Sequence, residues 1–142
     1  MRAAKALEMG ATEVFDPRST RVPAAIKERT NGEGVDVAVE AVGVEASLKD
    51  CLASTRYRGR VVVQGIFTDR VPIHMLGFVT REVTMVGTNS HDLDQAMAWV
   101  ASERVVPDAM VTKVIGLDEI QRGGFDALCD GASDEVKILV KP

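Results

Sequence analysis

The spacing of apolar residues alternates between a helical and an extended pattern along the chain. Within residues 92–102 the apolar side chains recur three and four residues apart, which places them on one face of a helix. They are Leu93, Ala96, Met97, Val100 and Ala101. At residues 61–63 three valines follow one another without alternation, as is typical of a strand covered on both faces of a parallel sheet. Repeated alternation of this kind predicts an α/β fold of βαβ units, with helices on both faces of the sheet.

Turn and capping residues divide this pattern into elements. Pro23 fits a helix only in its first turn, so the second helix is expected to begin close to it. Pro72 confines the extended residues 71–73 to a sheet edge, because proline donates no backbone hydrogen bond. Asp118, with Gln121 three residues later, resembles a capping box at the start of the last helix. Helices are expected over residues 2–9, 20–30, 44–52, 92–102 and 118–131, and strands over residues 13–15, 35–40, 61–63, 83–87 and 136–140.

The composition is that of an ordinary soluble globular protein, with 46% apolar and 27% charged residues. The length of 142 residues suggests a single domain, and the net charge of −4 without a basic block argues against a nucleic-acid partner. Cys51 and Cys129 form neither a disulfide framework nor a CxxC zinc pair. No apolar run approaches the roughly 20 residues that span a bilayer. The first ten residues do not resemble a signal peptide, so we expect a cytoplasmic protein.

A search for self-contained catalytic sets gives a mostly negative result. The two histidines, His74 and His91, have no further histidine or cysteine at a metal-ligand spacing. A Ser-His-Asp set stays open, because triads are recognised by geometry, but the chain has no Gly-x-Ser-x-Gly elbow. It has no Gly-x-x-x-x-Gly-Lys-Ser/Thr phosphate loop either. We therefore expect no catalytic residue and no metal ligand in this chain.

Three glycines lie at the carboxyl ends of successive predicted strands, where ligands of open α/β sheets bind. They are Gly43, Gly65 and Gly87. Without a Cβ, each allows a flat ligand to approach the backbone closely. The alternative is that they are ordinary strand-to-loop glycines.

Five segments carry a resemblance to a known family: KALEMGATEVFDP (5–17), GEGVDVAVEAVG (32–43), GRVVVQGI (59–66), IGLDEIQRGGFDAL (115–128) and VKILV (136–140). The first three resemble the zinc-dependent medium-chain alcohol dehydrogenases, and the last two resemble the butanediol, sorbitol and threonine dehydrogenase branch of that superfamily. The resemblance covers essentially the whole chain, in the order of the family. It implies an NAD- or NADP-dependent oxidation of a secondary alcohol, with hydride transfer to the nicotinamide.

The resemblance also implies which residues contact the cofactor. Residues 41–43 would lie near the adenosine and nicotinamide ribose, and residues 64–66 against the nicotinamide, whose carboxamide meets backbone groups in the family. Val86 and Thr88 would flank the same ring, and Lys137 would reach the pyrophosphate. Lys137 as a solvated charge on a strand is the alternative. The expected cofactor-binding residues are Ala41, Val42, Gly43, Gln64, Gly65, Ile66, Val86, Thr88 and Lys137.

The family's cofactor domain begins with a strand, a Gly-x-Gly-x-x-Gly turn, a helix and a second strand, which this sequence does not contain. We therefore expect a partial Rossmann-like parallel sheet that lacks its first two strands. Residues 1–88 would form this incomplete dinucleotide-binding domain. Residues 89–142 would be a C-terminal α+β segment that in the family returns to the catalytic domain. The family's zinc ligands also lie outside these residues.

This interpretation predicts a C-terminal fragment of a zinc-dependent alcohol or polyol dehydrogenase that is inactive alone, with cofactor binding weak or lost. The alternatives are a non-catalytic remnant that serves as a weak nucleotide-binding or dimerisation module, and a half that a separate N-terminal chain completes. Residues 13–15 would either pair directly with residues 35–40 or leave an open sheet edge. Residues 71–73 resemble the edge through which family members form homodimers, with a plain surface connection as the alternative. The strands near residues 114 and 136–140 could pair with each other.

Overall fold

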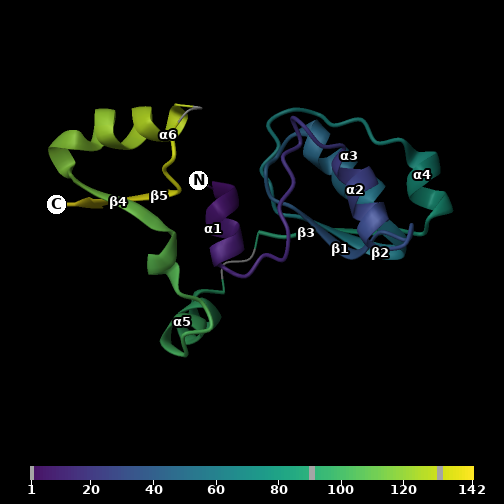
Figure 1. Cartoon of the computed structure of the whole chain (residues 1–142), viewed down its shortest axis with the longest axis horizontal. Helices are drawn as coiled ribbons and strands as arrows, with labels where there is room; N and C mark the ends of the chain where they lie inside the picture. The colour runs from purple at the N-terminus through teal and green to yellow at the C-terminus, as the bar shows by residue number, and fades with distance from the viewer. Residues whose placement is uncertain (1, 90–91, 131–132) are drawn as a thin grey trace. The chain divides into compact units, whose positions relative to one another are not determined.

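The computed structural model describes residues 2–89, 92–130 and 133–142 of the chain (Figure 1). The chain forms two compact units, one of residues 15–91 and one of residues 1–14 with 92–142. The prediction of a dinucleotide-binding domain over residues 1–88 and a C-terminal segment over residues 89–142 stays a prediction. The unit of residues 15–91 ends close to that boundary, but residues 1–14 group with the C-terminal residues.

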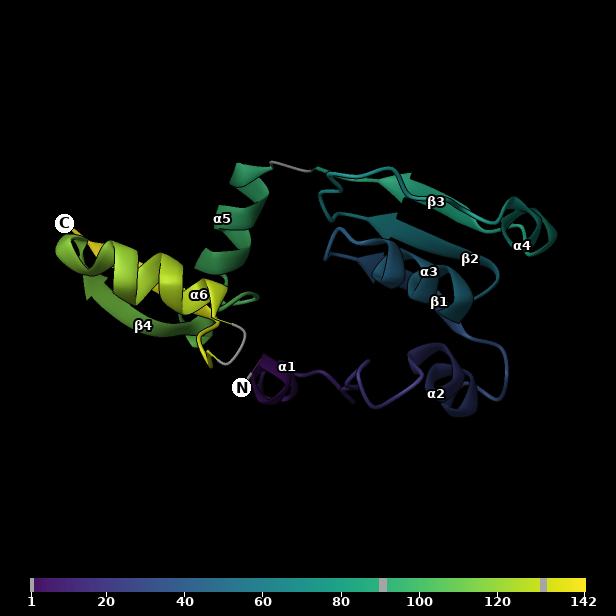
Figure 2. The ribbon, with the colours of Figure 1, turned by 90° about the horizontal axis from the view of Figure 1, so that it is seen from above.

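The unit of residues 15–91 is built on a three-stranded parallel sheet of order β1-β2-β3, comprising β1 (Val35–Glu40), β2 (Thr55–Val63) and β3 (Thr84–Gly87). Figure 2 shows the three strands side by side, with their arrowheads at the same end. Ala38 pairs with Val61, and Val61 with Met85. The predicted parallel sheet is therefore confirmed, and the carboxyl ends of its strands lie at one edge.

Among the described residues of this unit, helices pack on one face of this sheet, whereas the sequence predicts helices on both faces. Helix α3 (Glu45–Ser54) packs on β1 and β2, with α2 (Val22–Arg29) beside it. The core consists of Ala38, Leu48, Val61 and Val83, with partly buried apolar side chains from α3 and residues 67–78 packed around it. Val37, Val39 and Val86 lie on the opposite face and are exposed within this unit, because side chains alternate between the faces of a strand.

Two short segments that the sequence predicts to be extended do not form strands. Residues 13–15 join no sheet, and among the described residues β1 has β2 as its only strand partner. The prediction of a strand there is wrong, because three residues without a ladder have no hydrogen bonds to hold them extended. In residues 71–73, Val71 and Ile73 instead turn their side chains onto the core, and the described segment joins no sheet.

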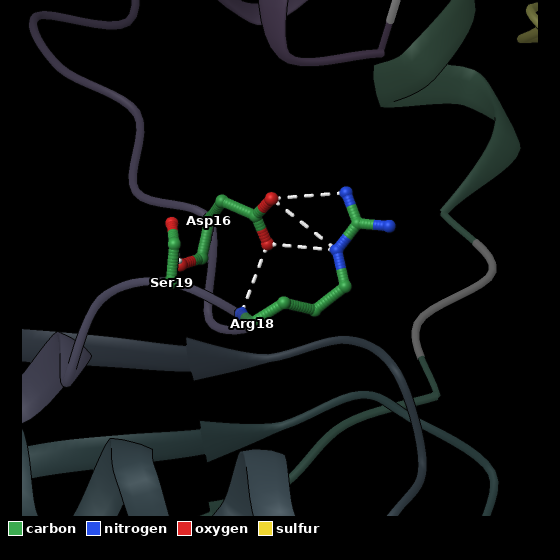
Figure 3. Close-up of polar contacts among 3 residues, drawn as sticks. All are labelled: Asp16, Arg18 and Ser19. Carbon is green, nitrogen blue, oxygen red and sulfur yellow. Dashed lines mark hydrogen bonds and ion pairs between the residues drawn. The ribbon is translucent and has the colours of Figure 1, made fainter.

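A charged turn joins residues 13–15 to α2 (Figure 3). The Asp16 carboxylate accepts hydrogen bonds from the Arg18 backbone N–H at 2.9 Å and from its guanidinium at 2.9–3.2 Å. The Asp16 carbonyl accepts from the backbone N–H groups of Ser19 and Thr20. The hydrogen bonds from Arg18 lower the pKa of Asp16. All three side chains in the figure belong to an exposed turn that directs the chain into α2.

The second unit contains a two-stranded parallel sheet of β4 (Val111–Gly116) and β5 (Lys137–Lys141). The two segments, which the sequence suggested could pair with each other, do pair. Helix α5 (Leu93–Ala101) also forms where the apolar stripe predicts it, and its first turn is capped by Asp92, whose carboxylate accepts from Gln95 N at 2.9 Å. The unit further contains α1 (Arg2–Glu8) and the 3-10 turn η1 (Pro107–Met110).

The last helical segment is irregular. It runs as a 3-10 turn η2 (Leu117–Glu119), a π-helical stretch η3 (Ile120–Asp126) and a short α6 (Ala127–Cys129). The predicted capping box at Asp118 is wrong, because the helical segment begins at Leu117 and Glu119 accepts from the Gly116 N–H at 3.4 Å. Gly124 is buried, and a Cβ there would lie 3.4 Å from Ile115 Cδ1.

Candidate functional site

The candidate site lies at the carboxyl ends of β1, β2 and β3, where the chain leaves the sheet in three loops. The first loop contains Ala41, Val42 and Gly43, and the second contains Gln64, Gly65 and Ile66. Val86 and Thr88 belong to the end of β3. Because the three strands are parallel and adjacent, eight of the nine predicted cofactor-binding residues gather along this one edge.

The first two loops are in direct backbone contact. A Cβ at Gly65 would lie 2.8 Å from Gly43 Cα and would collide with the Gly43 nitrogen and Glu40 Oε2. Gly43 has φ +85°, and a Cβ there would collide with the Ile66 carbonyl. Glycine is required at both positions, at Gly65 by the close approach and at Gly43 also by the left-handed backbone. Gly87 differs, because a Cβ there would meet nothing within 4 Å.

Most backbone donors of these loops are engaged inside the protein. Gln64 N and Gly65 N donate to the Glu40 carbonyl at 2.8 and 3.0 Å, and Thr88 N donates to the Val63 carbonyl at 2.9 Å. Val42 N and Gly43 N donate to Glu40 Oε1. A ligand at this edge would therefore meet carbonyl oxygens and side chains, which suits a ligand group that donates hydrogen bonds.

The side chains at the edge are mainly apolar and open to solvent. Val42 is 69% exposed and Ile66 85% exposed, and Val86 is also exposed. Exposed apolar side chains beside glycine-lined backbone provide a surface on which a flat ring can pack. Thr88 and Gly43 are half-buried at the base of this surface.

Glu40, the last residue of β1, is the one charged residue of the site that is fully buried among the described residues, with 1% of its surface exposed. Its Oε1 accepts from Val42 N and Gly43 N at 2.9 Å each and from Ser47 Oγ at 2.6 Å. Burial raises the pKa of the Glu40 carboxyl, but the hydrogen bonds from Ser47, Gly43 and Val42 outweigh it and hold the pKa below its ordinary value. Glu40 is therefore a carboxylate at neutral pH.

Sequence reasoning did not identify Glu40 and Ser47 as part of the site. The available signal was an acidic residue at the end of an otherwise apolar strand, directly before a glycine-containing loop. Lys137, the ninth predicted residue, lies on β5 in the other unit, where its side chain is exposed. Its contact with a cofactor stays a prediction.

The described residues provide no metal centre. Across residues 2–89, 92–130 and 133–142, no three His, Cys, Asp or Glu side chains gather in an arrangement that could hold a metal ion. Cys51 and Cys129 are free, and burial raises the pKa of the Cys51 thiol. His74 directly precedes α4 (Met75–Thr80), and His91 lies outside the described residues. These residues do not fit a catalytic zinc site, which needs three protein ligands and an open position.

Comparison with known proteins gives a consistent family match. Residues 1–102 match the family model for zinc-binding dehydrogenases. The chain is 38% identical to (R,R)-butanediol dehydrogenase of Bacillus subtilis, over 99% of this chain and 41% of that protein. It is 28% identical to sorbitol dehydrogenase of the same organism, over the whole of this chain and 41% of that protein. The chain thus spans about two-fifths of the length of these relatives.

Solved structures of dehydrogenases also resemble this chain in fold. The crystal structure of 2R,3R-butanediol dehydrogenase from Bacillus subtilis superimposes with a TM-score of 0.85 at 40% identity, over 99% of this chain and 41% of that one. A putative zinc-binding dehydrogenase from Sinorhizobium meliloti, solved bound to NADP, gives a TM-score of 0.85 at 30% identity, over 99% of this chain and 42% of that one.

In the part of the chain that the structure describes, every helix is too short or too polar to cross a bilayer.

Proposed function

This chain belongs to the zinc-binding dehydrogenase family, among the medium-chain alcohol and polyol dehydrogenases, and we propose on that basis that it supplies the nicotinamide-binding edge of an NAD(P)-dependent enzyme oxidising a secondary alcohol. The observation that carries the proposal is the backbone contact between the loops of Gly43 and Gly65 beside exposed Val42 and Ile66. Ligands of open α/β sheets bind at this end of the strands.

The proposed roles follow from the groups that each loop presents. Val42 and Gly43 line the ribose side, and Ile66 packs against the nicotinamide ring. Because the loop N–H groups are engaged by Glu40, the carbonyl oxygens near Gln64 and Gly65 accept from the carboxamide NH₂ of the cofactor. Val86 and Thr88 flank the ring. These residues would hold the nicotinamide ring, which supplies the hydride acceptor when the cofactor is bound.

We propose that these 142 residues do not oxidise alcohols by themselves. The family's zinc acts as a Lewis acid on the substrate oxygen, and the described residues offer no ligand set for it. The free thiols of Cys51 and Cys129 suit a reducing compartment, which supports a cytoplasmic location.

The test is a titration of the ¹⁵N-labelled chain with NADH, followed by NMR, together with an assay for NADH formation from 2,3-butanediol, NAD and zinc. We expect weak binding, with a dissociation constant of about 1 mM, shift changes at residues 41–43, 64–66, 86 and 88, and no turnover. Shift changes confined to other residues would refute the cofactor site. Binding in the low micromolar range would refute the weak affinity, and turnover would refute the inactivity.

We also propose a homodimer formed around residues 71–73, with α4 as its neighbouring surface. The side chains of Val71 and Ile73 pack against the core. Met75 and Leu76, at the start of α4, are instead 55% and 67% exposed. Replacing Met75 with aspartate should shift sedimentation from dimer to monomer, since a charge in an apolar contact is costly to desolvate. Leu117→Asp, at a similarly exposed leucine of the other unit, is the control and should leave the sedimentation unchanged. Equal sedimentation of Met75→Asp and the unmodified chain would refute this dimer.

A further inference from the structure

We propose that Glu40 is the positioning residue of this site: its buried carboxylate locks the loops after β1 and β2 together and so fixes the backbone that the cofactor contacts. This inference deepens the proposed function and rests on it for the cofactor's part. The structural part, the locking of two loops by one carboxylate, stands on the contacts of Glu40 alone.

The first argument is the number of loop groups that converge on one oxygen. Glu40 Oε1 accepts from Val42 N, Gly43 N and Ser47 Oγ at 2.9, 2.9 and 2.6 Å. The first two donors belong to the loop itself, and Ser47 belongs to the first turn of α3. The carboxylate therefore holds the end of β1, the loop and the start of α3 in one arrangement.

The second argument is the connection to the neighbouring loop. Glu40 Oε2 is buried without a hydrogen-bond partner among the described residues, and it faces Gly65 so closely that a Cβ there would collide with it. The Glu40 carbonyl accepts from Gln64 N and Gly65 N. Glu40 thus contacts the loop after β1 through Oε1 and the loop after β2 through both Oε2 and its backbone.

The third argument is the free-energy cost of burying a carboxylate. A charged group at 1% exposure is expensive unless hydrogen bonds compensate it. The hydrogen-bond donors described for the Glu40 carboxylate are all neutral: the two backbone N–H groups of the loop and the Ser47 hydroxyl. These donors compensate the cost of burying the charge. Fixing those donors turns the loop N–H groups inward and leaves the outer surface to Val42 and Ile66.

The experiment compares Glu40→Gln and Ser47→Ala with the unmodified chain. Glutamine keeps the shape of the side chain and one acceptor oxygen but loses the charge, and Ser47→Ala removes one of the three donors without touching the carboxylate. Glu82→Gln is the matched control, since Glu82 also accepts two side-chain hydrogen bonds, from Tyr57 and Arg58, but lies exposed just before β3, at the other end of the sheet.

The first readout, amide hydrogen exchange by NMR, needs no cofactor. In Glu40→Gln, exchange at Val42 and Gly43 should become about tenfold faster, while exchange at residues 61–63 stays unchanged. Ser47→Ala should give a smaller change at the same two amides, and Glu82→Gln none. Unchanged exchange at Val42 and Gly43 in Glu40→Gln would overturn the inference, and so would a uniform acceleration over the whole sheet, which would indicate a merely structural role.

The second readout is the NADH dissociation constant from the same NMR titration. Glu40→Gln should weaken binding about tenfold, and Glu82→Gln should leave it within about twofold. Faster exchange with unchanged NADH affinity would overturn the positioning role. If the unmodified chain shows no NADH-dependent chemical-shift changes at this edge, the proposed function is refuted. The amide-exchange data still test whether Glu40 locks the two loops together.

Discussion

Replacing Gly65 with alanine is expected to lower the free energy of unfolding by about 3 kcal/mol. The added Cβ would collide with Glu40 Oε2 and with the Gly43 nitrogen, and it would lie 2.8 Å from Gly43 Cα. Neither neighbour can yield easily, because one is a buried carboxylate held by three donors and the other is backbone of a loop packed against Ile66. Denaturant unfolding followed by circular dichroism measures the effect.

Gly87→Ala is the matched control for this prediction. Gly87 ends β3 as Gly65 follows β2, but a Cβ at Gly87 would meet nothing within 4 Å. The unfolded chain has fewer conformations with alanine at this position than with glycine, so it loses less conformational entropy on folding. Gly87→Ala should therefore leave stability unchanged or raise it by about 0.5 kcal/mol. Similar losses in the two variants would contradict the close approach of the two loops. NADH binding should be lost in Gly65→Ala.

The sequence predicted the three strands of the central sheet because their signals are local, although β2 (Thr55–Val63) begins before the predicted residues 61–63. Residues 35–40 are flanked by glycines and dominated by β-branched side chains, and the predicted strand coincides with β1. The apolar stripe of α5 and its cap at Asp92 are equally local, since a helix needs only spacing and a first-turn acceptor. The pairing of β4 with β5 was a possibility that the sequence left open, and the structure shows it.

Elements that depend on partners could not be predicted in this way. Residues 13–15 have strand-like composition, but a strand exists only through its ladder, and β1 pairs with β2 alone among the described strands. Residues 71–73 lack a ladder as well, and their apolar side chains gain more by packing on the core. The π-helical stretch Ile120–Asp126 places Gly123 and Gly124 close to Ile115, a contact that spacing alone does not reveal.

The candidate site was predicted in part for the same reason. Gly43 and Gly65 stand out in the sequence because glycine at a strand end marks a close approach, and the structure places them in contact. Glu40 did not stand out, because an acidic residue at a strand end is ordinarily solvated. Its burial follows from the loop folding back over it and from Ser47, seven residues later, turning its hydroxyl toward the carboxylate.

The stability of this fold should depend on acid through Glu40. The hydrogen bonds to the folded carboxylate hold its pKa below the ordinary value of 4.5. A group whose pKa is lowered by folding binds protons more readily in the unfolded chain. It therefore stabilises the fold fully above about pH 4.5, and this contribution disappears as the pH falls through the lower, folded pKa.

Glu40→Gln removes this titration and so isolates it. Near pH 7 the variant should be less stable than the unmodified chain by about 2 kcal/mol, the usual worth of hydrogen bonds to a buried charged group. The difference should shrink as the pH is lowered from 4.5, because protonation turns the carboxylate of the unmodified chain into a neutral group like the amide. Glu82→Gln is the control: hydrogen bonds from Tyr57 and Arg58 lower the pKa of Glu82 too, but solvent screens this exposed carboxylate, so its difference curve should be much flatter. Equilibrium unfolding of the three proteins between pH 7 and about pH 3 measures both curves, and a Glu40→Gln difference that stays constant or grows in acid would contradict the ionised, buried state of Glu40.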